Sequence, residues 1–306
     1  MKILVATEKP FAAAAVNGIR QIAEGAGHEL VLLEKYTDKA QLLEAVADVD
    51  AMIVRSDKVT AEVVAAAPKL KIVVRAGAGF DNLDLPACTE KGVVAMNTPG
   101  QNSNAVAELA IAMMIFMSRN QFTPGTGMEV KGKKVGIQAY GNVGRLVAEK
   151  AKALGMEVMA FDPFVPAEKM VEEGVIPAES LEQMYEQCNF VSLHIPAIPA
   201  TIGSINYNLI SRMPKGGCVV NTARKEVINE PELVKVLEDR PDIKYVTDVA
   251  AAIQAELNEK FPKQVFATPK KMGAETAEAN INAGLAAAQQ ICDYFATGCT
   301  KFQLNK

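Results

Sequence analysis

The 306-residue sequence lacks two features that would each assign it to a class of protein. It has no run of about 18 uncharged apolar residues, which a membrane-spanning helix requires. It also has no basic excess, because 32 lysines and arginines stand against 36 aspartates and glutamates and the net charge is −4. A nucleic-acid partner would require a basic face. We therefore expect no membrane and no nucleic-acid partner, and attraction for a substrate has to come from local charges.

Cysteine is also scarce and follows no pattern. The chain has five cysteines, an odd number, and none of the spacings typical of metal sites. They are Cys88, Cys188, Cys218, Cys292 and Cys299. Residues 1–11 contain too short an apolar core for a signal peptide and fit a first strand. The sequence therefore predicts a cytoplasmic protein with reduced, packed thiols and no metal site.

The length and the alternation of elements predict the fold class. A chain of 306 residues suggests about two domains, because a single core rarely grows beyond roughly 250 residues. Apolar runs typical of strands alternate with segments of helical spacing, which indicates parallel sheets covered on both faces. Strands are expected at residues 2–6, 29–33, 51–54, 72–75, 157–161, 190–194, 218–220, 245–247 and 265–267, with another beginning at Val135. Helices are expected at residues 12–25, 40–46, 61–66, 104–118, 145–154, 167–173, 181–187, 231–237 and 276–297.

Residues 133–162 follow the strand, glycine turn, helix, strand pattern of a dinucleotide-binding unit. Gly141 allows the backbone to approach a pyrophosphate, and Gly144 allows the helix to pack closely on the strand. Asp162 follows the second strand, where it would bind the ribose hydroxyls and repel a 2′-phosphate, so NAD is favoured over NADP. Ala139 replaces the usual first glycine. The alternative is an ordinary strand-to-helix turn without a ligand.

Two arginines follow expected strands. Arg55 comes after residues 51–54, and Arg75 ends residues 72–75 just before a glycine-rich loop. Ligands of parallel sheets bind beyond the carboxyl ends of the strands, so the pair fits a shared site for a carboxylate and a phosphate. The alternative for each is a solvated surface arginine.

The segment 104–118 predicts a long helix that is apolar on all sides. Such a helix is buried, here between two domains or two subunits. Residues 121–132, with a proline and three glycines, are expected to form a linker into the nucleotide-binding domain.

Several motifs in order resemble the D-isomer-specific 2-hydroxyacid dehydrogenases. They are RAGAGFDNLDL, NTPGQNSNAVAE, GIQAYGNVGR, AFDPF, CNFVSLHIP and MPKGGCVVNTARKEVINEPEL. The resemblance implies two doubly wound parallel-sheet α/β domains, an NAD-binding Rossmann domain and a flavodoxin-like substrate domain, with the active site in the cleft between them. It also implies a homodimer formed through the nucleotide-binding domain. We place the Rossmann domain at residues 99–281 and the substrate domain at residues 1–98 and 282–306.

The resemblance also assigns roles to residues. Arg224 matches the arginine that binds the substrate carboxylate and polarises the C2 oxygen, and Asp248 matches the residue that holds the nicotinamide amide. The full set of matched cofactor residues is Ala78, Gly141, Asn142, Val143, Asp162, Ile195, Thr222, Ala223 and Asp248. Gly77 and Ala78 would offer backbone N–H groups to the substrate carboxylate. Arg55 and Arg75 match positions that distinguish the phosphate-binding member of the family.

The chain departs from the family at the acid–base pair. Ile253 occupies the place of the usual glutamate, and Thr-Pro-Lys-Lys-Met-Gly-Ala replaces the histidine turn. The only histidines, His28 and His194, do not match the catalytic position, and His194 is expected to be structural. Counting back from the glycine puts Lys271 in the place of the histidine, whereas counting forward from the threonine puts Lys270 there. We favour Lys271 as the base, with a pKa lowered by neighbouring positive charge and partial burial.

The resemblance thus predicts an NAD-dependent oxidoreductase acting on a phosphorylated 2-hydroxy acid. A glyoxylate or hydroxypyruvate reductase of the same family is one alternative. A binding protein that uses NAD to set its conformation for a partner, as corepressors of this fold do, is another.

Overall fold

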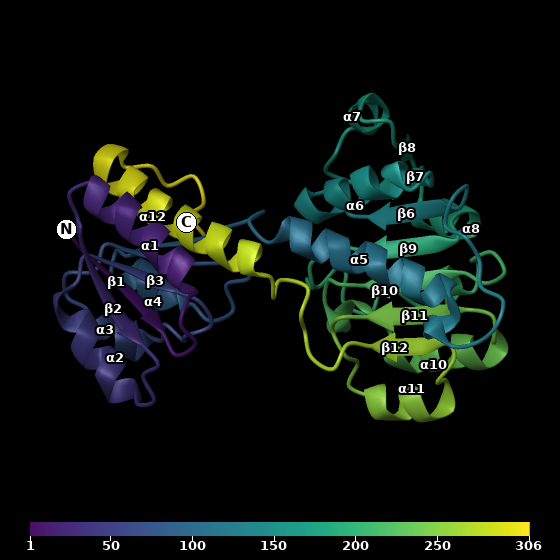
Figure 1. The fold of residues 1–306 in the computed structure, drawn as a ribbon, viewed down its shortest axis with the longest axis horizontal. Helices are drawn as coiled ribbons and strands as arrows, with labels where there is room; N and C mark the ends of the chain where they lie inside the picture. The colour runs from purple at the N-terminus through teal and green to yellow at the C-terminus, as the bar shows by residue number, and fades with distance from the viewer. Residues whose placement is uncertain (306) are drawn as a thin grey trace. The chain divides into compact units, whose positions relative to one another are not determined.

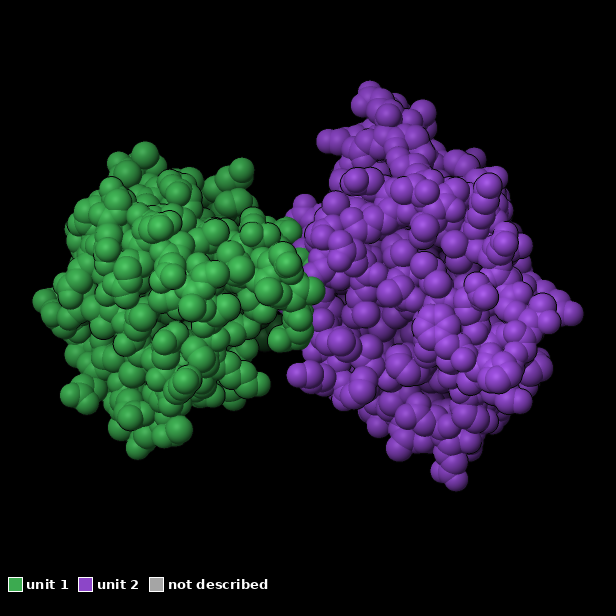
Figure 2. Space-filling model, viewed as in Figure 1, with its two compact units in different colours: residues 1–102, 275–306 green, residues 103–274 purple. Residues whose placement is uncertain are grey.

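The structure, a computed structural model, describes residues 1–305 and divides into two compact units, coloured separately in Figure 2. Unit 1 comprises Met1–Asn102 and Glu275–Lys306, and unit 2 comprises Ser103–Ala274. The discontinuous organisation agrees with the prediction, but both boundaries differ from it. The second lies at 274/275 rather than 281/282, because the whole of the last helix, α12 (Ala277–Thr297), packs within unit 1.

Unit 1 is built on a sheet of five parallel strands in the order β2-β1-β3-β4-β5, which is the predicted flavodoxin-like order. The strands are β1 (Lys2–Thr7), β2 (Glu29–Glu34), β3 (Ala51–Val54), β4 (Ile72–Arg75) and β5 (Val94–Asn97). Strands β3 and β4 are apolar along nearly their whole length, because helices cover both faces of the sheet. The helices of this unit are α1 (Ala13–Gly25), α2 (Lys39–Ala45), α3 (Ala61–Ala65), α4 (Leu85–Glu90) and α12.

Helices α1 and α12 lie side by side on one face of this sheet (Figure 1). Glycine permits their close approach. A Cβ at Gly18 would overlap the side chain of Leu285, and one at Gly284 would lie 3.0 Å from Cδ1 of Ile19. The two ends of the chain are therefore packed into one core, which explains why unit 1 is discontinuous.

Unit 2 is built on a sheet of seven parallel strands in the order β12-β11-β10-β9-β6-β7-β8. The order reverses at β6, as in dinucleotide-binding folds, and this confirms the predicted Rossmann domain. Its strands are β6 (Lys134–Gln138), β7 (Glu157–Phe161), β8 (Ile176–Pro177), β9 (Phe190–Leu193), β10 (Cys218–Asn221), β11 (Lys244–Thr247) and β12 (Val265–Ala267). Its helices are α5 (Ser103–Ser118), α6 (Asn142–Ala153), α7 (Ala167–Glu172), α8 (Leu181–Gln187), α9 (Tyr207–Ile210), α10 (Glu230–Asp239) and α11 (Gln254–Lys260).

The long helix α5 packs beside α6 against the sheet of unit 2 (Figure 1). Its buried side includes Ala107, Met114 and Met117, but Glu108 and Ala112 are exposed. In the single chain the helix is therefore not buried on all sides, and burial of its open part against a second subunit stays a prediction.

The cysteines also differ in part from expectation. All five are free thiols, and four are buried, but Cys299 is exposed rather than packed. Burial raises the pKa of Cys218 to about 12, so this thiol is protonated and unreactive at neutral pH. Within residues 1–305, no helix has both the length and the apolarity needed to cross a membrane.

Candidate functional site

The two predicted arginines lie together at the carboxyl edge of unit 1. Arg55 directly follows β3, and Arg75 is the last residue of the neighbouring strand β4, paired with Val54 in register. The Nε of Arg75 donates to the carbonyl oxygen of Arg55 at 3.1 Å. Their juxtaposition follows from the strand order.

Uncharged oxygens hold the guanidinium of Arg55. Its Nη1 donates to the carbonyl oxygens of Lys9 (3.2 Å) and Pro10 (3.3 Å), its Nη2 donates to Oδ1 of Asn280, and Cζ lies 5.2 Å from the centre of the Phe11 ring. In the part of the chain that the structure describes, no carboxylate is within ion-pair distance of this group. Its positive charge is thus available to an anion.

Gly77, in the loop after Arg75, does not have the predicted role of offering its N–H to the substrate carboxylate. The N–H of Gly77 donates to Oγ1 of Thr98 at 2.6 Å, and both residues are buried, so this N–H is engaged within the protein. Gly77 has φ +146, and a Cβ there would overlap the guanidinium of Arg75. Glycine at this position therefore makes room for the arginine, and Ala78 remains as the predicted N–H donor.

The glycine turn of unit 2 has the geometry of a pyrophosphate site. Gly141 precedes helix α6, and a Cβ there would meet nothing within 4 Å, so the space in front of the helix start is open. Gly144 is required for packing, because a Cβ there would overlap the carbonyl oxygen of Ala139. Asn142 and Val143 occupy the first helical turn, whose N–H groups have no partner within the helix. Ala139 takes the left-handed conformation, φ +76, that its glycine counterpart would adopt.

Asp162 closes this turn. One carboxylate oxygen accepts from the N–H of Tyr140 at 2.8 Å, and the other accepts from the N–H of Phe164 at 2.8 Å. A carboxylate has about four acceptor positions, so each oxygen can still accept a ribose hydroxyl. The predicted role of Asp162 fits this geometry.

A cluster that the sequence did not reveal lies beneath the same turn. The buried Tyr140 donates its hydroxyl to Glu173 at 2.8 Å, and Arg145 pairs with the same carboxylate while its Cζ lies 4.5 Å from the centre of the Tyr140 ring. Burial and the bond to Glu173 raise the pKa of Tyr140 to about 12. The tyrosine therefore remains a hydrogen-bond donor and fixes the turn from below.

The segment after β10 is held by Asn221, a buried residue for which we predicted no role. Its Oδ1 accepts from the N–H of Ala223 at 3.0 Å, and its Nδ2 donates to the carbonyl oxygen of Arg224 at 2.9 Å. Thr222, between Asn221 and Ala223, has a buried Oγ1 without a hydrogen-bond partner among residues 1–305. An unpartnered hydroxyl, an open helix start and a carboxylate with spare acceptor positions together fit a dinucleotide. Ile195, which follows β9, is buried at the same edge of the sheet.

Arg224 is half-buried at the end of this segment. Its Nη1 donates to the carbonyl oxygen of Ala223 at 2.9 Å, which orients the guanidinium along the loop. Because Arg224 is fixed through both its backbone and its side chain, it can present a pre-oriented positive fork to a carboxylate.

Asp248 fastens the lysine turn. This carboxylate is 1% exposed and accepts three hydrogen bonds, from Oγ1 of Thr268 (2.8 Å), the N–H of Met272 (2.9 Å) and the N–H of Gly273 (2.8 Å). The turn is thus tied at both ends, and Lys270 and Lys271 lie exposed between the ties. Asp248 therefore determines where the lysines stand.

The remaining predictions concern Ile253 and His194. Ile253 precedes helix α11 and packs against the core of unit 2. His194 follows β9, where burial lowers its pKa to about 3, and its Nε2 lies 3.0 Å from Oγ of Ser192. A neutral, hydrogen-bonded histidine agrees with the structural role expected for it.

Comparison with known proteins identifies the family. The model of the D-isomer specific 2-hydroxyacid dehydrogenase NAD binding domain matches residues 107–270, which fall within unit 2. The chain belongs to this family. Unit 2 therefore contains the NAD-binding domain of this family.

Individual relatives differ in length. A D-3-phosphoglycerate dehydrogenase of Methanocaldococcus jannaschii is 35% identical over 83% of this chain and 51% of its own length. A hydroxypyruvate reductase of Thermotoga maritima is 34% identical over 86% of this chain and 90% of its own. The chain therefore spans about half the length of the curated phosphoglycerate dehydrogenase, but nearly all of the reductase.

Among solved structures, the NAD+-bound 3-phosphoglycerate dehydrogenase of Entamoeba histolytica is similar over the whole chain. It shares 50% of its sequence with this protein, at a TM-score of 0.88, over 100% of this chain and 99% of its own. D-2-hydroxyisocaproate dehydrogenase, at 20% identity and a TM-score of 0.82, shows the same fold.

Proposed function

We propose that the protein is a D-3-phosphoglycerate dehydrogenase, which oxidises 3-phospho-D-glycerate to 3-phosphohydroxypyruvate with NAD+ at the start of serine biosynthesis. The observation that carries the proposal is the arginine pair, Arg55 and Arg75, joined by the 3.1 Å bond at the carboxyl edge of unit 1. Two guanidinium groups suit a phosphate dianion, because charge-assisted hydrogen bonds to phosphate are about twice as strong as neutral ones. The 50% identity to a 3-phosphoglycerate dehydrogenase supports the same substrate.

The other substrate contacts come from two loops in this proposal. Arg224 binds the carboxylate and polarises the C2 oxygen, and the N–H of Ala78 also binds the carboxylate. Within residues 1–305, the N–H groups of Ala78 and Gly79 donate to no protein acceptor, so both are available. Holding the carboxylate and the phosphate at once fixes the C2 carbon, and such positioning supplies a large part of the rate in hydride transfer.

The cofactor residues of the proposal are those that match the cofactor contacts of the family. Asp162 binds the adenosine ribose, the start of α6 with Gly141, Asn142 and Val143 binds the pyrophosphate, and Ile195, Thr222, Ala223 and Ala78 complete the contacts. Bound NAD+ supplies the hydride acceptor. Asp248 has an acceptor position left for the nicotinamide amide after its three bonds to the turn.

We assign proton removal to the lysine turn, and to Lys271 rather than Lys270. Lys271 directly precedes Met272, whose N–H is tied to Asp248, so its backbone is better fixed than that of Lys270, which is one residue farther from this tie. A base has to stand within hydrogen-bond reach of the hydroxyl in a fixed geometry. Turnover of Lys271→Met should fall at least a hundredfold and that of Lys270→Met much less. The reverse pattern would move the assignment to Lys270.

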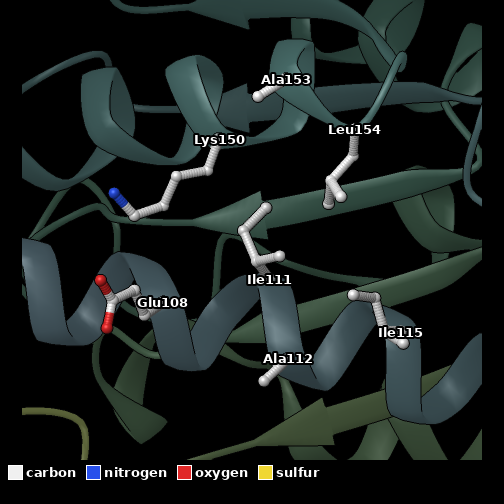
Figure 3. A pocket seen from close by; sticks show the side chains of 7 residues that line it. All are labelled: Glu108, Ile111, Ala112, Ile115, Lys150, Ala153 and Leu154. Carbon is white, nitrogen blue, oxygen red and sulfur yellow. The ribbon is translucent and has the colours of Figure 1, made fainter.

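We further propose that the chain forms a homodimer through unit 2 and acts in the cytoplasm. The open side of α5 forms an apolar groove with α6, lined by Ile111, Ala112, Ile115 and Leu154, with Glu108 and Lys150 at one end (Figure 3). The same groove of a second copy would cover this surface in a two-fold dimer. Glu108 of each copy would then face Lys150 of the other. Sedimentation at micromolar concentration should give twice the monomer mass, and an Ala112→Arg variant should give the monomer.

The cytoplasmic location is supported by the five free thiols, which suit a reducing compartment.

The test of the activity is NADH oxidation by the purified protein with 3-phosphohydroxypyruvate and, in parallel, with hydroxypyruvate. Preference for the phosphorylated acid would support the proposal. Equal use of both would favour a hydroxypyruvate reductase, a candidate supported by the Thermotoga maritima relative. NADH binding without turnover on either acid would favour a protein that senses NAD.

A further inference from the structure

A buried carboxylate stands two residues after Arg55. Asp57 is 6% exposed, and its Oδ1 accepts from the N–H of Glu8 (2.7 Å) and the hydroxyl of Tyr36 (2.8 Å), while its Oδ2 accepts from the N–H of Arg55 (3.3 Å). Burial, with the bond to Asp57, raises the pKa of Tyr36, so this hydroxyl stays protonated and donates. The donors belong to the segments that follow β1, β2 and β3. One side chain therefore ties three loops together at the edge that bears the arginine pair.

These ties surround Arg55. Because the N–H of Glu8 is bound to Asp57, the next two residues are held in place, and their carbonyl oxygens are the acceptors of Nη1 of Arg55. Asn82, from the loop after β4, donates its Nδ2 to the carbonyl oxygens of Asp57 (2.7 Å) and Arg55 (3.3 Å). The latter oxygen also accepts from Arg75. The backbone and the guanidinium of Arg55 are therefore fixed by one connected network.

A carboxylate beside a site for a phosphate would by itself oppose binding. In this structure, both of its oxygens are turned to donors within the fold and the side chain is nearly inaccessible. The carboxylate of Asp57 therefore contributes by holding Arg55 and the neighbouring loops in place. An arginine loses rotamer freedom when it is immobilised, and a site that is ordered before binding does not lose this from its affinity.

We propose that Asp57, with Tyr36 and Asn82, is the positioning network that gives the protein its selectivity for the phosphorylated acid, an inference that rests on the proposed function. The three residues hold Arg55 where the substrate phosphate arrives, and they do not themselves contact the substrate. Loss of one tie lets the guanidinium move, so the phosphorylated acid binds less well. Hydroxypyruvate, which has no phosphate, is unaffected.

The test is Tyr36→Phe, which removes one donor of Asp57 and keeps the ring. The KM for 3-phosphohydroxypyruvate should rise about tenfold, whereas its kcat and both constants for hydroxypyruvate should change less than about twofold. Tyr207→Phe is the matched control, because Tyr207 likewise donates to a carboxylate, that of Asp239 at 3.0 Å, but belongs to unit 2, whereas the arginine pair belongs to unit 1. It should leave all four constants unchanged. A purely structural loss would instead lower kcat for both acids in parallel.

Asn82→Ser provides a second variant in case Tyr36→Phe fails to fold, because it removes the two bonds to carbonyl oxygens and keeps the carboxylate satisfied. The same split between the acids is expected. The inference would be overturned if both variants kept the full wild-type preference for the phosphorylated acid. It would also be overturned if the KM rose equally for both acids. Either result would leave the proposed function standing. A wild-type protein without any preference would overturn the proposed function, and the inference with it.

Discussion

Replacing Ala139 by glycine should stabilise the protein. Ala139 occupies the first position of the glycine turn with φ +76, in the left-handed region that L-residues rarely adopt. Its neighbours enforce this conformation. Its N–H donates to the carbonyl oxygen of Phe161 at 2.9 Å, the next N–H is bound to Asp162, and its carbonyl oxygen packs against Gly144. The turn therefore stores strain that an alanine side chain causes and a glycine would not.

The magnitude follows from two opposing terms. A left-handed L-residue costs about 1–2 kcal/mol, and glycine removes this. Glycine also increases the entropy of the unfolded chain, which costs about 0.4–1 kcal/mol. The middles of the two ranges differ by about 0.8 kcal/mol, so the free energy of unfolding should rise by about this amount in Ala139→Gly. The affinity for NADH should change less than about twofold, because the turn already has the conformation that the cofactor requires.

The assay is urea unfolding of both proteins, with the midpoint compared at equal slope. Ala286→Gly is the control, since Ala286 lies in the middle of α12, where the same substitution should destabilise by about 1 kcal/mol. If Ala139→Gly were destabilised as much as the control, the reasoning from backbone strain would be refuted.

Three further predictions concern the cofactor, the lysine turn and pH. Asp162→Ser removes the carboxylate that would repel a 2′-phosphate, so the ratio of kcat/KM for NADH over NADPH should fall at least tenfold; an unchanged ratio would contradict the role of Asp162. Thr268→Val keeps the shape of the side chain but removes its hydrogen bond to Asp248. The kcat should fall about tenfold with the KM for NADH unchanged, and full turnover would show that this tie does not position the lysines. Because burial lowers the pKa of His194 to about 3, the unfolded chain takes up a proton below pH 6.5 and the folded chain does not. Stability should therefore fall by about 2 kcal/mol between pH 6.5 and 5, at about 1.4 kcal/mol per pH unit, and His194→Gln should remove this part of the slope in unfolding experiments.

Much of the fold could be predicted from the sequence because the strands are buried on both faces. The strands at Ala51–Val54, Ile72–Arg75, Glu157–Phe161 and Val265–Ala267 have the bounds that were predicted. Short elements were missed. Helix α11 has no side chain that caps its start, and α4 has only six residues, although Asp84 caps it and a proline stands in its first turn. Short helices like these cannot be predicted from local sequence alone, because most of their stability comes from tertiary packing.

Apart from the residues matched through the family motifs, the candidate site could be predicted only where a residue type is rare in its context. The glycine turn and an arginine at a strand end are such cases. Asn221 and Asp57 are not, because polar residues after strands are common and only the folded chain shows which of them are buried and fully bonded. The engagement of the Gly77 N–H by Thr98 could not be predicted for the same reason, since the two residues stand 21 positions apart in the sequence.

The arginine pair makes substrate preference the most direct test of the account. The measurement is the ratio of kcat/KM for 3-phosphohydroxypyruvate to that for hydroxypyruvate, with NADH, for the wild-type protein. We predict a ratio of about 100 or more, which corresponds to about 2.7 kcal/mol for the phosphate and is within the range for charge-assisted hydrogen bonds from two arginines. A ratio near 1 would contradict the proposal that Arg55 and Arg75 bind the phosphate of the substrate.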